Sequence, residues 1–167
     1  MKKTDKNLIP LWEQYKESFL VIPSNLGFTK NNQNVMGRGL ALKIKEYFLE
    51  QSINIPIHYG KKCKNKVLTK DTSTIDIFNE FRLIFFATKP LSKQPWLSWK
   101  QDSSLELIEK GCIELKFLLD TKLKDKLIFM PFLGCGNGNL NRKDVLEILK
   151  KYFKDYDNVI LSFYKEE

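Results

Sequence analysis

Residues Leu127 to Lys150 carry the clearest structural signal in the chain and read Leu-Ile-Phe-Met-Pro-Phe-Leu-Gly-Cys-Gly-Asn-Gly-Asn-Leu-Asn-Arg-Lys-Asp-Val-Leu-Glu-Ile-Leu-Lys. An apolar run passes into a loop with glycine at positions 134, 136 and 138, and the loop passes into an amphipathic helical pattern. Glycines lack the Cβ atom that keeps a ligand away from the backbone, and they permit positive φ angles. The start of a helix adds free N–H groups and a positive dipole end. The stretch therefore predicts a strand, a phosphate-binding loop and a helix.

Hydrophobic periodicity predicts further strands and helices in alternation. We expect strands at residues 18–23, 66–69, 83–87, 127–132 and 158–163, and helices at residues 39–50, 103–119 and 143–153. Asp102 or Ser103 is expected to cap the middle helix, with Glu106 completing a capping box, and Asn141 to cap the last helix. This alternation indicates βαβ units, and hence a three-layer α/β domain built on a largely parallel sheet.

Composition is typical of one globular domain that spans residues 1–167, with a mass of 19.7 kDa and 43% hydrophobic residues. No apolar run has the length of a membrane span or a signal peptide core, so we expect a soluble, cytoplasmic monomer. Cys63, Cys112 and Cys135 have no CxxC spacing, and His58 is the single histidine. We therefore expect neither a disulfide framework nor a metal site.

The net charge of +8 has two interpretations. An excess of lysine creates a field that attracts an anionic partner such as a nucleic acid. The lysines are scattered, however, and arginine occurs only at Arg38, Arg82 and Arg142, while Asn and Ile are abundant. A biased base composition of the coding genome produces the same pattern, and both interpretations stay open.

Three loops follow the carboxyl ends of predicted strands, at residues 25–37, 88–100 and 134–141. Ligands of open α/β sheets bind beyond these strand ends. In the first loop, the amide of Asn25 can both donate to and accept from a sugar hydroxyl, and Gly37 and Gly39 open the next helix. The alternative is a flexible, Asn-rich surface turn.

The middle loop contains Lys89 directly after a buried strand, where it would face the ligand crevice. A lysine in this place can bind a phosphate, or act as a nucleophile if burial lowers its pKa. Pro90 and Pro95 stiffen the loop, and Trp96 and Trp99 suit it to stacking on a base or covering the site. The alternative is a solvated lysine in a loop that its tryptophans hold down.

The third loop, Gly134-Cys-Gly-Asn-Gly-Asn139, departs from both common nucleotide-binding patterns. It has no Gly-Lys-Ser/Thr ending of a Walker A sequence, and Asn139 stands where GxGxxG would need glycine. Nucleoside triphosphate chemistry and NAD hydride transfer are therefore disfavoured. Cys135 has no neighbouring base in the sequence, so we expect it to pack beneath the loop and not to act as a nucleophile.

Three motifs in this order resemble those of the macro domain family, an α/β/α module with a mixed, largely parallel sheet that binds ADP-ribose. Val35-Met-Gly-Arg-Gly-Leu-Ala-Leu42 is similar to the family's Val-Met-Gly-Lys-Gly-Ile-Ala-Leu type of segment. Phe86-Ala-Thr-Lys89 is similar to its Phe-Pro-Thr-Lys element, and Gly134-Cys-Gly-Asn-Gly-Asn-Leu140 to its Gly-Cys-Gly-Asn-Gly-Gly-Leu loop. The resemblance covers most of the chain. It is greatest for the branch of DNA ADP-ribosyl glycohydrolase antitoxins and terminal ADP-ribose glycohydrolases.

The resemblance implies a cleft for ADP-ribose, with no further cofactor. Lys89 would be the catalytic residue, adding as an amine to the anomeric carbon of the distal ribose. Asn25 would contact that ribose, the first loop would wrap the ribose and diphosphate, and the third loop would donate backbone N–H groups to the diphosphate. The expected ligand-binding residues are Asn25, Val35, Met36, Gly37, Arg38, Gly39, Leu133, Gly134, Cys135, Gly136, Asn137, Gly138 and Asn139.

We therefore expect an ADP-ribosyl hydrolase that removes ADP-ribose from a modified macromolecule such as DNA, in toxin neutralisation or phage defence. Gly138 stands where relatives that cleave acidic side-chain esters carry an aspartate, and the family's adenine-binding aspartate ahead of the first loop is not recognisable. The first loop is also longer, by residues 29–34. Two alternatives stay open: a module that binds ADP-ribose or a related NAD-derived nucleotide without cleaving it, and a phosphatase for ADP-ribose 1″-phosphate.

Overall fold

A six-stranded sheet in the order β1-β6-β5-β2-β4-β3 forms the centre of the computed structural model, which describes residues 1–164. Its strands are β1 (Lys2–Thr4), β2 (Phe19–Asn25), β3 (Ile75–Phe78), β4 (Leu83–Lys89), β5 (Ile128–Met130) and β6 (Val159–Ser162). Neighbouring strands are parallel except β3 and β4, which pair antiparallel at one edge. The mixed, largely parallel sheet is confirmed.

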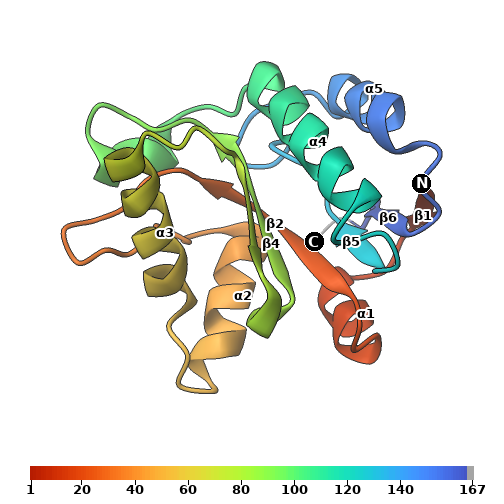
Figure 1. Ribbon diagram of the computed structural model, residues 1–167, viewed down its shortest axis with the longest axis horizontal. Coiled ribbons are helices and arrows are strands. Elements are labelled where there is room, and N and C mark those ends of the chain that lie inside the picture. The colour runs from red at the N-terminus through yellow and green to blue at the C-terminus, as the bar shows by residue number, and fades with distance from the viewer. Residues whose placement is uncertain (165–167) are drawn as a thin grey trace.

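Helices cover both faces of this sheet (Figure 1). They are α1 (Leu8–Gln14), α2 (Gly39–Leu49), α3 (Ile55–Thr69), α4 (Leu105–Asp120) and α5 (Arg142–Phe153), with short 3₁₀ helices η1 (Asn79–Phe81) and η2 (Pro95–Lys100). In Figure 1, α4 and α5 lie on one side of the strands and α1 to α3 on the other. Among residues 1–164, no helix combines the length and apolar character needed to cross a bilayer.

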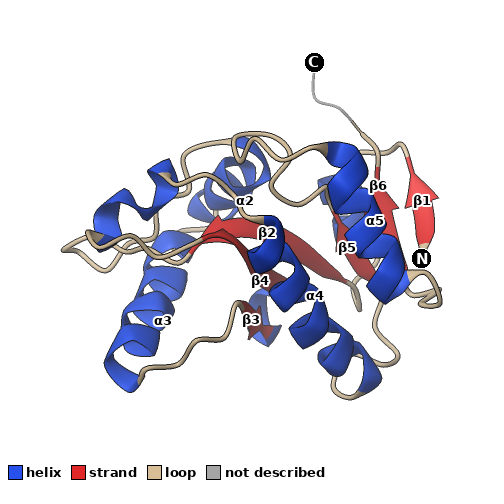
Figure 2. Cartoon of the chain, turned by 90° about the horizontal axis from the view of Figure 1, so that it is seen from above, coloured by secondary structure: helices blue, strands red, loops and turns tan. Residues whose placement is uncertain are grey.

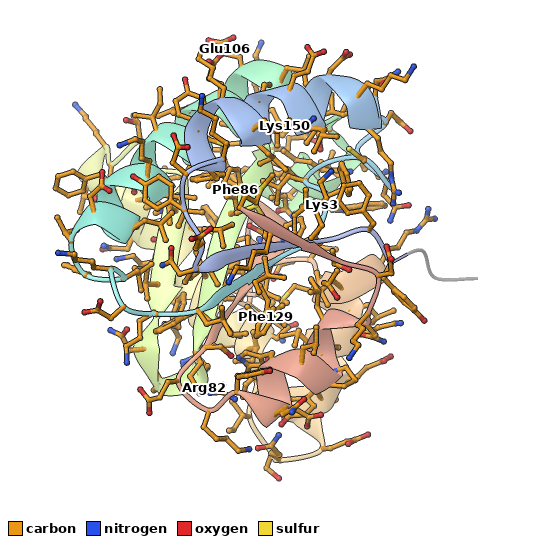
Figure 3. The ribbon with its side chains drawn as sticks, turned by 90° about the vertical axis from the view of Figure 1, so that its right-hand side faces the viewer. Lys3, Arg82, Phe86, Glu106, Phe129 and Lys150 are labelled. Carbon is orange, nitrogen blue, oxygen red and sulfur yellow. The ribbon has the colours of Figure 1, made fainter. Side chains whose placement is uncertain are left out.

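The central strands are apolar over most of their length because both of their faces are buried. Successive side chains alternate between the faces, so Ile84 and Phe86 of β4 pack with α4 and α5, whereas Leu83 and Phe85 pack with α1 to α3. Figure 3 shows Phe86 beneath α4 and α5, and Phe129 on the opposite side of the sheet. Two hydrophobic cores, one for each face, hold the layers together.

The sheet brings the three predicted loops to one edge. The strands β2, β4 and β5 are parallel neighbours, so their carboxyl ends point the same way. Asn25 at the end of β2 is the register partner of Lys89 at the end of β4, with an irregularity between Ser24 and Asn25. Figure 2 shows these strands from above, between their helical layers.

The expected strand at residues 66–69 is wrong, because these residues form the last turn of α3. Tyr59, Cys63 and Lys66 are all buried, and their spacing places them on one face of that helix. The side chain of Lys66 is buried because its Nζ atom forms an ion pair with Asp76 of β3 and donates to the carbonyl of Ser73 at 2.9 Å. The elements β1, α1, α3 and β3 were not predicted from the sequence.

The cap of α4 also differs from the prediction. Ser104, and neither Asp102 nor Ser103, is the N-cap, and its hydroxyl accepts from the N–H of Leu107 at 3.2 Å. The two residues that were expected as caps form hydrogen bonds with the third loop instead. The N–H of Ser103 donates to the carbonyl of Gly138 at 3.1 Å, and Asp102 accepts from the side chain of Asn139 at 3.0 Å. The Asn141 cap of α5 is confirmed.

Candidate functional site

A cleft of about 1020 Å³ opens at the carboxyl ends of the central strands. Its volume is at the upper end of the range for small-molecule sites, which is about 300–1,000 Å³. The predicted site residues that line it are Asn25, Val35, Met36, Gly37, Arg38, Gly39, Lys89, Gly134, Cys135, Gly136, Asn137, Gly138 and Asn139. Leu133 is the exception, because its side chain is fully buried in the core beneath α4 and α5. The structure therefore brings all three loops to one cavity.

Lys89 lies at the meeting point of two of these loops. Its Nζ atom donates to the carbonyl oxygens of Trp99 at 2.9 Å and Asn137 at 3.1 Å. Burial lowers the pKa of Lys89 because it disfavours the charged amine, Asp102 opposes this shift, and Arg38 adds to it. The site therefore contains a half-buried amine that is oriented by backbone and more readily deprotonated than a surface lysine.

The three glycines of the third loop serve different purposes. Gly134 adopts a φ of +69°, which a residue with a side chain rarely does, and Gly136 has open space where a Cβ would lie. At Gly138, a Cβ would lie 2.1 Å from the Ser103 hydroxyl oxygen and 2.5 Å from the Gly134 carbonyl oxygen. Position 138 is glycine because Ser103 occupies the space, and an aspartate in this place would not fit the observed packing.

The first loop is built on a buried amide network. The side chain of Asn25 donates to the carbonyl of Val35 at 3.0 Å and accepts from the N–H of Gly27 at 2.9 Å. Asn34, which is 2% exposed, donates to the backbone and side-chain oxygens of Asn25 and to the carbonyl of Gly27. The amide that we predicted to contact a sugar thus also shapes the loop, and its contact with ligand stays a prediction.

Arg38 connects the first and third loops across the cleft. Its Nη1 atom donates to the side-chain oxygen of Asn137 at 3.3 Å. Arg38 is also the N-cap residue of α2, and no side chain of residues 1–164 caps this helix. The first N–H groups of α2 are therefore left for another acceptor, and the helix dipole favours an anion there.

Several lining residues were not identified from the sequence: Asn7, Asp102, Ser103, Phe132, Ser162 and Tyr164. Asp102 supplies a carboxylate to the cleft from the start of α4, although Gly138 of the third loop has none. In the sequence, Asp102 was interpreted only as a candidate helix cap. Asn7 caps α1 by accepting from the N–H of Ile9 at 3.1 Å. Its helix was not predicted, so its place at the cleft could not be inferred.

Two further residues with reactive side chains are Cys135, which lines the cleft, and His58, which does not. The Sγ atom of Cys135 donates to the carbonyl of Leu133 at 3.4 Å, and burial raises the pKa of its thiol. A raised pKa keeps the sulfur protonated and weakly nucleophilic. His58 is exposed on α3 and packs edge-on against Phe81, with ring centroids 5.0 Å apart, outside the cleft.

Comparison with known proteins identifies the fold. No protein-family model matches the chain. The DNA ADP-ribosyl glycohydrolases of Mycobacterium tuberculosis and Mycobacterium bovis are 30% identical over 142 residues, which is 81% of this chain and 36% of theirs. The macrodomain of M. tuberculosis DarG superposes with a TM-score of 0.68 at 23% identity, covering 99% of this chain and 97% of that one. The chain has the macro domain fold.

Two further structures share the fold of this macro domain. The macrodomain of Thermus aquaticus DarG has a TM-score of 0.66 at 23% identity, covering 99% of this chain and 97% of that one. Thermosipho africanus DarTG in complex with ADP-ribose has a TM-score of 0.60 at 19% identity, covering 91% of this chain and 40% of that one. This macro domain therefore spans little more than a third of the length of the curated relatives that it matches.

Proposed function

We propose that this macro domain binds ADP-ribose and removes it from modified DNA, with Lys89 as the catalytic residue. The observation that carries the proposal is the position of Lys89, whose amine lies between the carbonyls of Trp99 and Asn137 at one end of the cleft and whose pKa is lowered by burial. The relatives named DNA ADP-ribosyl glycohydrolase support the activity, and the DarTG complex supports the ligand.

The length of the cleft supports a ligand with two nucleoside-like ends. Lys89 is the last residue of β4, whereas Ser162 ends β6 and Tyr164 lies just beyond it, three strand positions away in the sheet. At about 4.8 Å per strand, these ends lie about 14 Å apart. We place the adenine near Asn7, Phe132 and Tyr164, where aromatic rings offer a stacking surface, and the reacting ribose near Lys89.

The diphosphate would lie between the two glycine-containing loops. The uncapped N-terminus of α2 offers N–H groups on one side, and the backbone of residues 134–139 offers them on the other. Arg38, which joins the two loops through Asn137, adds a positive charge beside this position. The arrangement would hold the distal ribose with its anomeric carbon toward the lysine.

The chemistry begins with the neutral amine of Lys89 attacking the anomeric carbon. A carbon–nitrogen bond to Lys89 forms, the bond from the sugar to the DNA base breaks, and the base leaves with the bonding electron pair and takes a proton. Water then adds to the same carbon, the carbon–nitrogen bond to Lys89 breaks, and a proton from the water passes to the nitrogen, which releases ADP-ribose and restores the amine. Burial promotes the first step, because it increases the fraction of neutral amine at a given pH.

The test is turnover of a single-stranded oligonucleotide that carries ADP-ribose on a base, followed by release of ADP-ribose. We expect Lys89→Ala to reduce turnover by at least about 100-fold while still binding free ADP-ribose in calorimetry. Lys61→Ala, which removes an exposed lysine of α3 outside the cleft, is the control and should keep most of the rate. Wild-type turnover by Lys89→Ala would refute the assignment. ADP-ribose binding without turnover of modified DNA, modified protein or ADP-ribose 1″-phosphate would leave only a binding module.

A further inference from the structure

Two tryptophans are exposed on the same side of η2. A 3₁₀ helix has three residues per turn, so side chains at positions i and i+3 eclipse each other. Trp96 and Trp99 have this spacing, and they are 47% and 41% exposed. Trp99 borders the cleft and its carbonyl contacts Lys89, whereas Trp96 lies outside the lining. The two indoles therefore form an aromatic strip that begins at the rim of the cleft and leads away from it.

The backbone that carries this strip is rigid. The hydroxyl of Ser98, a fully buried residue, donates to the carbonyl of Pro95 at 2.9 Å and accepts from the N–H of Ser92 at 3.0 Å. Gly27 of the first loop packs directly beneath η2, since a Cβ there would lie 2.2 Å from the Pro95 carbonyl oxygen. Exposed tryptophans on a fixed backbone lose little conformational entropy when they bind a partner.

The loop that carries the strip is positively charged. Between Thr88 and Gln101 the chain has three lysines, Lys89, Lys93 and Lys100, and no carboxylate. Lys93 and Lys100 are exposed, and the Nζ atom of Lys100 lies 5.3 Å from the centre of the Trp99 ring. Exposed aromatic faces interspersed with cations are the combination that binds single-stranded nucleic acid, because bases stack on the rings and phosphates pair with the cations.

We propose that Trp96, Trp99, Lys93 and Lys100, here called the η2 platform, bind the single-stranded DNA segment next to the modified nucleotide. The proposal deepens the proposed function and rests on it for the position of the modified base at Lys89. A base stacked on Trp99 lies beside that position, and the next unpaired base stacks on Trp96. A duplex does not fit this surface, because paired bases present no free face to an indole ring.

The first measurement is binding of an unmodified, fluorescently labelled single-stranded DNA of about ten nucleotides, followed by anisotropy. Stacking of one base on an aromatic side chain contributes about 1–3 kcal/mol, so Trp96→Ala should weaken binding by about 5- to 150-fold. Trp96→Phe keeps an aromatic face and should restore most of the affinity. Phe117→Ala removes an exposed aromatic of α4 and should change nothing.

Each outcome supports the η2 platform or overturns it. Equal affinity of Trp96→Ala and wild type overturns the platform, as does equal affinity for a duplex of the same sequence. Binding of an acidic peptide in place of the oligonucleotide also overturns it, in favour of a protein partner. Calorimetry with free ADP-ribose separates the two proposals, because Trp96 does not line the cleft and Trp96→Ala should bind ADP-ribose normally. If the protein binds DNA in a way that depends on Trp96 but shows no turnover that depends on Lys89, the hydrolase proposal is refuted and the η2 platform stands.

Discussion

Replacing Gly138 by alanine tests whether packing, and not ligand contact, keeps position 138 free of a side chain. The methyl carbon would lie 2.1 Å from the hydroxyl oxygen and 2.7 Å from the Cβ of Ser103, and 2.5 Å from the carbonyl oxygen of Gly134. These distances are well inside van der Waals contact. The Ser103 hydroxyl can rotate away, but the Gly134 carbonyl belongs to a backbone that already has a φ of +69°. The loop must therefore shift as a whole.

Such overpacking costs about 1–3 kcal/mol of unfolding free energy. In a domain of this size, 1 kcal/mol corresponds to about 2–4 °C in the melting temperature, so Gly138→Ala should melt about 2–12 °C below wild type. Gly136→Ala is the matched control in the same loop, because nothing lies within 4 Å of the added carbon. We expect its unfolding free energy to stay within about 0.5 kcal/mol of wild type.

Thermal unfolding followed by circular dichroism measures both variants, and urea titration gives the free energies. Ser103→Gly combined with Gly138→Ala should recover part of the loss, because it removes both side-chain atoms of Ser103 and leaves only the Gly134 contact. Gly138→Asp should be at least as unstable as Gly138→Ala. A Gly138→Ala protein that melts with wild type, or a Gly136→Ala protein that melts equally low, would refute the packing argument.

Further predictions concern charge. If the neutral amine of Lys89 is the nucleophile, turnover should rise with pH through its pKa, which burial lowers from the ordinary lysine value. Asp102→Asn removes a negative charge that raises the pKa of Lys89, so the rising limb of the pH–rate profile should move to lower pH. Arg38→Gln removes a positive charge that lowers this pKa, so the limb should move to higher pH. Variant profiles that coincide with the wild-type profile would contradict this. Lys66→Met should destabilise the fold by about 3–5 kcal/mol in urea unfolding, because it leaves a buried carboxylate unpaired. Lys116→Met breaks an exposed ion pair and should leave the urea midpoint unchanged, so equal effects of the two changes would contradict the burial argument.

The predicted elements that the structure confirms have strong local signals. β4 is apolar from Leu83 to Ala87 and β5 is apolar throughout, because both of their faces are buried, and α5 begins at an Asn cap followed by an amphipathic repeat. The elements that sequence reasoning missed lack such signals. Lysine interrupts the buried face of α3 at Lys66, and a buried aspartate interrupts the edge strand β3. In the sequence, Lys66 and Asp76 are each typical of an exposed position, because the partner of each in the buried ion pair lies in a different element.

Local features of the chain were enough to predict the strand–loop–helix units, the order of the three loops and the lysine at the end of β4. These follow from local periodicity, from glycine spacing and from motifs of a few residues. The contacts of those residues became visible only in the folded chain: the Ser103 side chain fills the space beside Gly138, the Asp102 carboxylate lies near Lys89, and two carbonyls orient the Lys89 amine. The physical reason is that sterics, desolvation and charge act through space between segments that the folded sheet brings together, whereas periodicity reports only on neighbours along the chain.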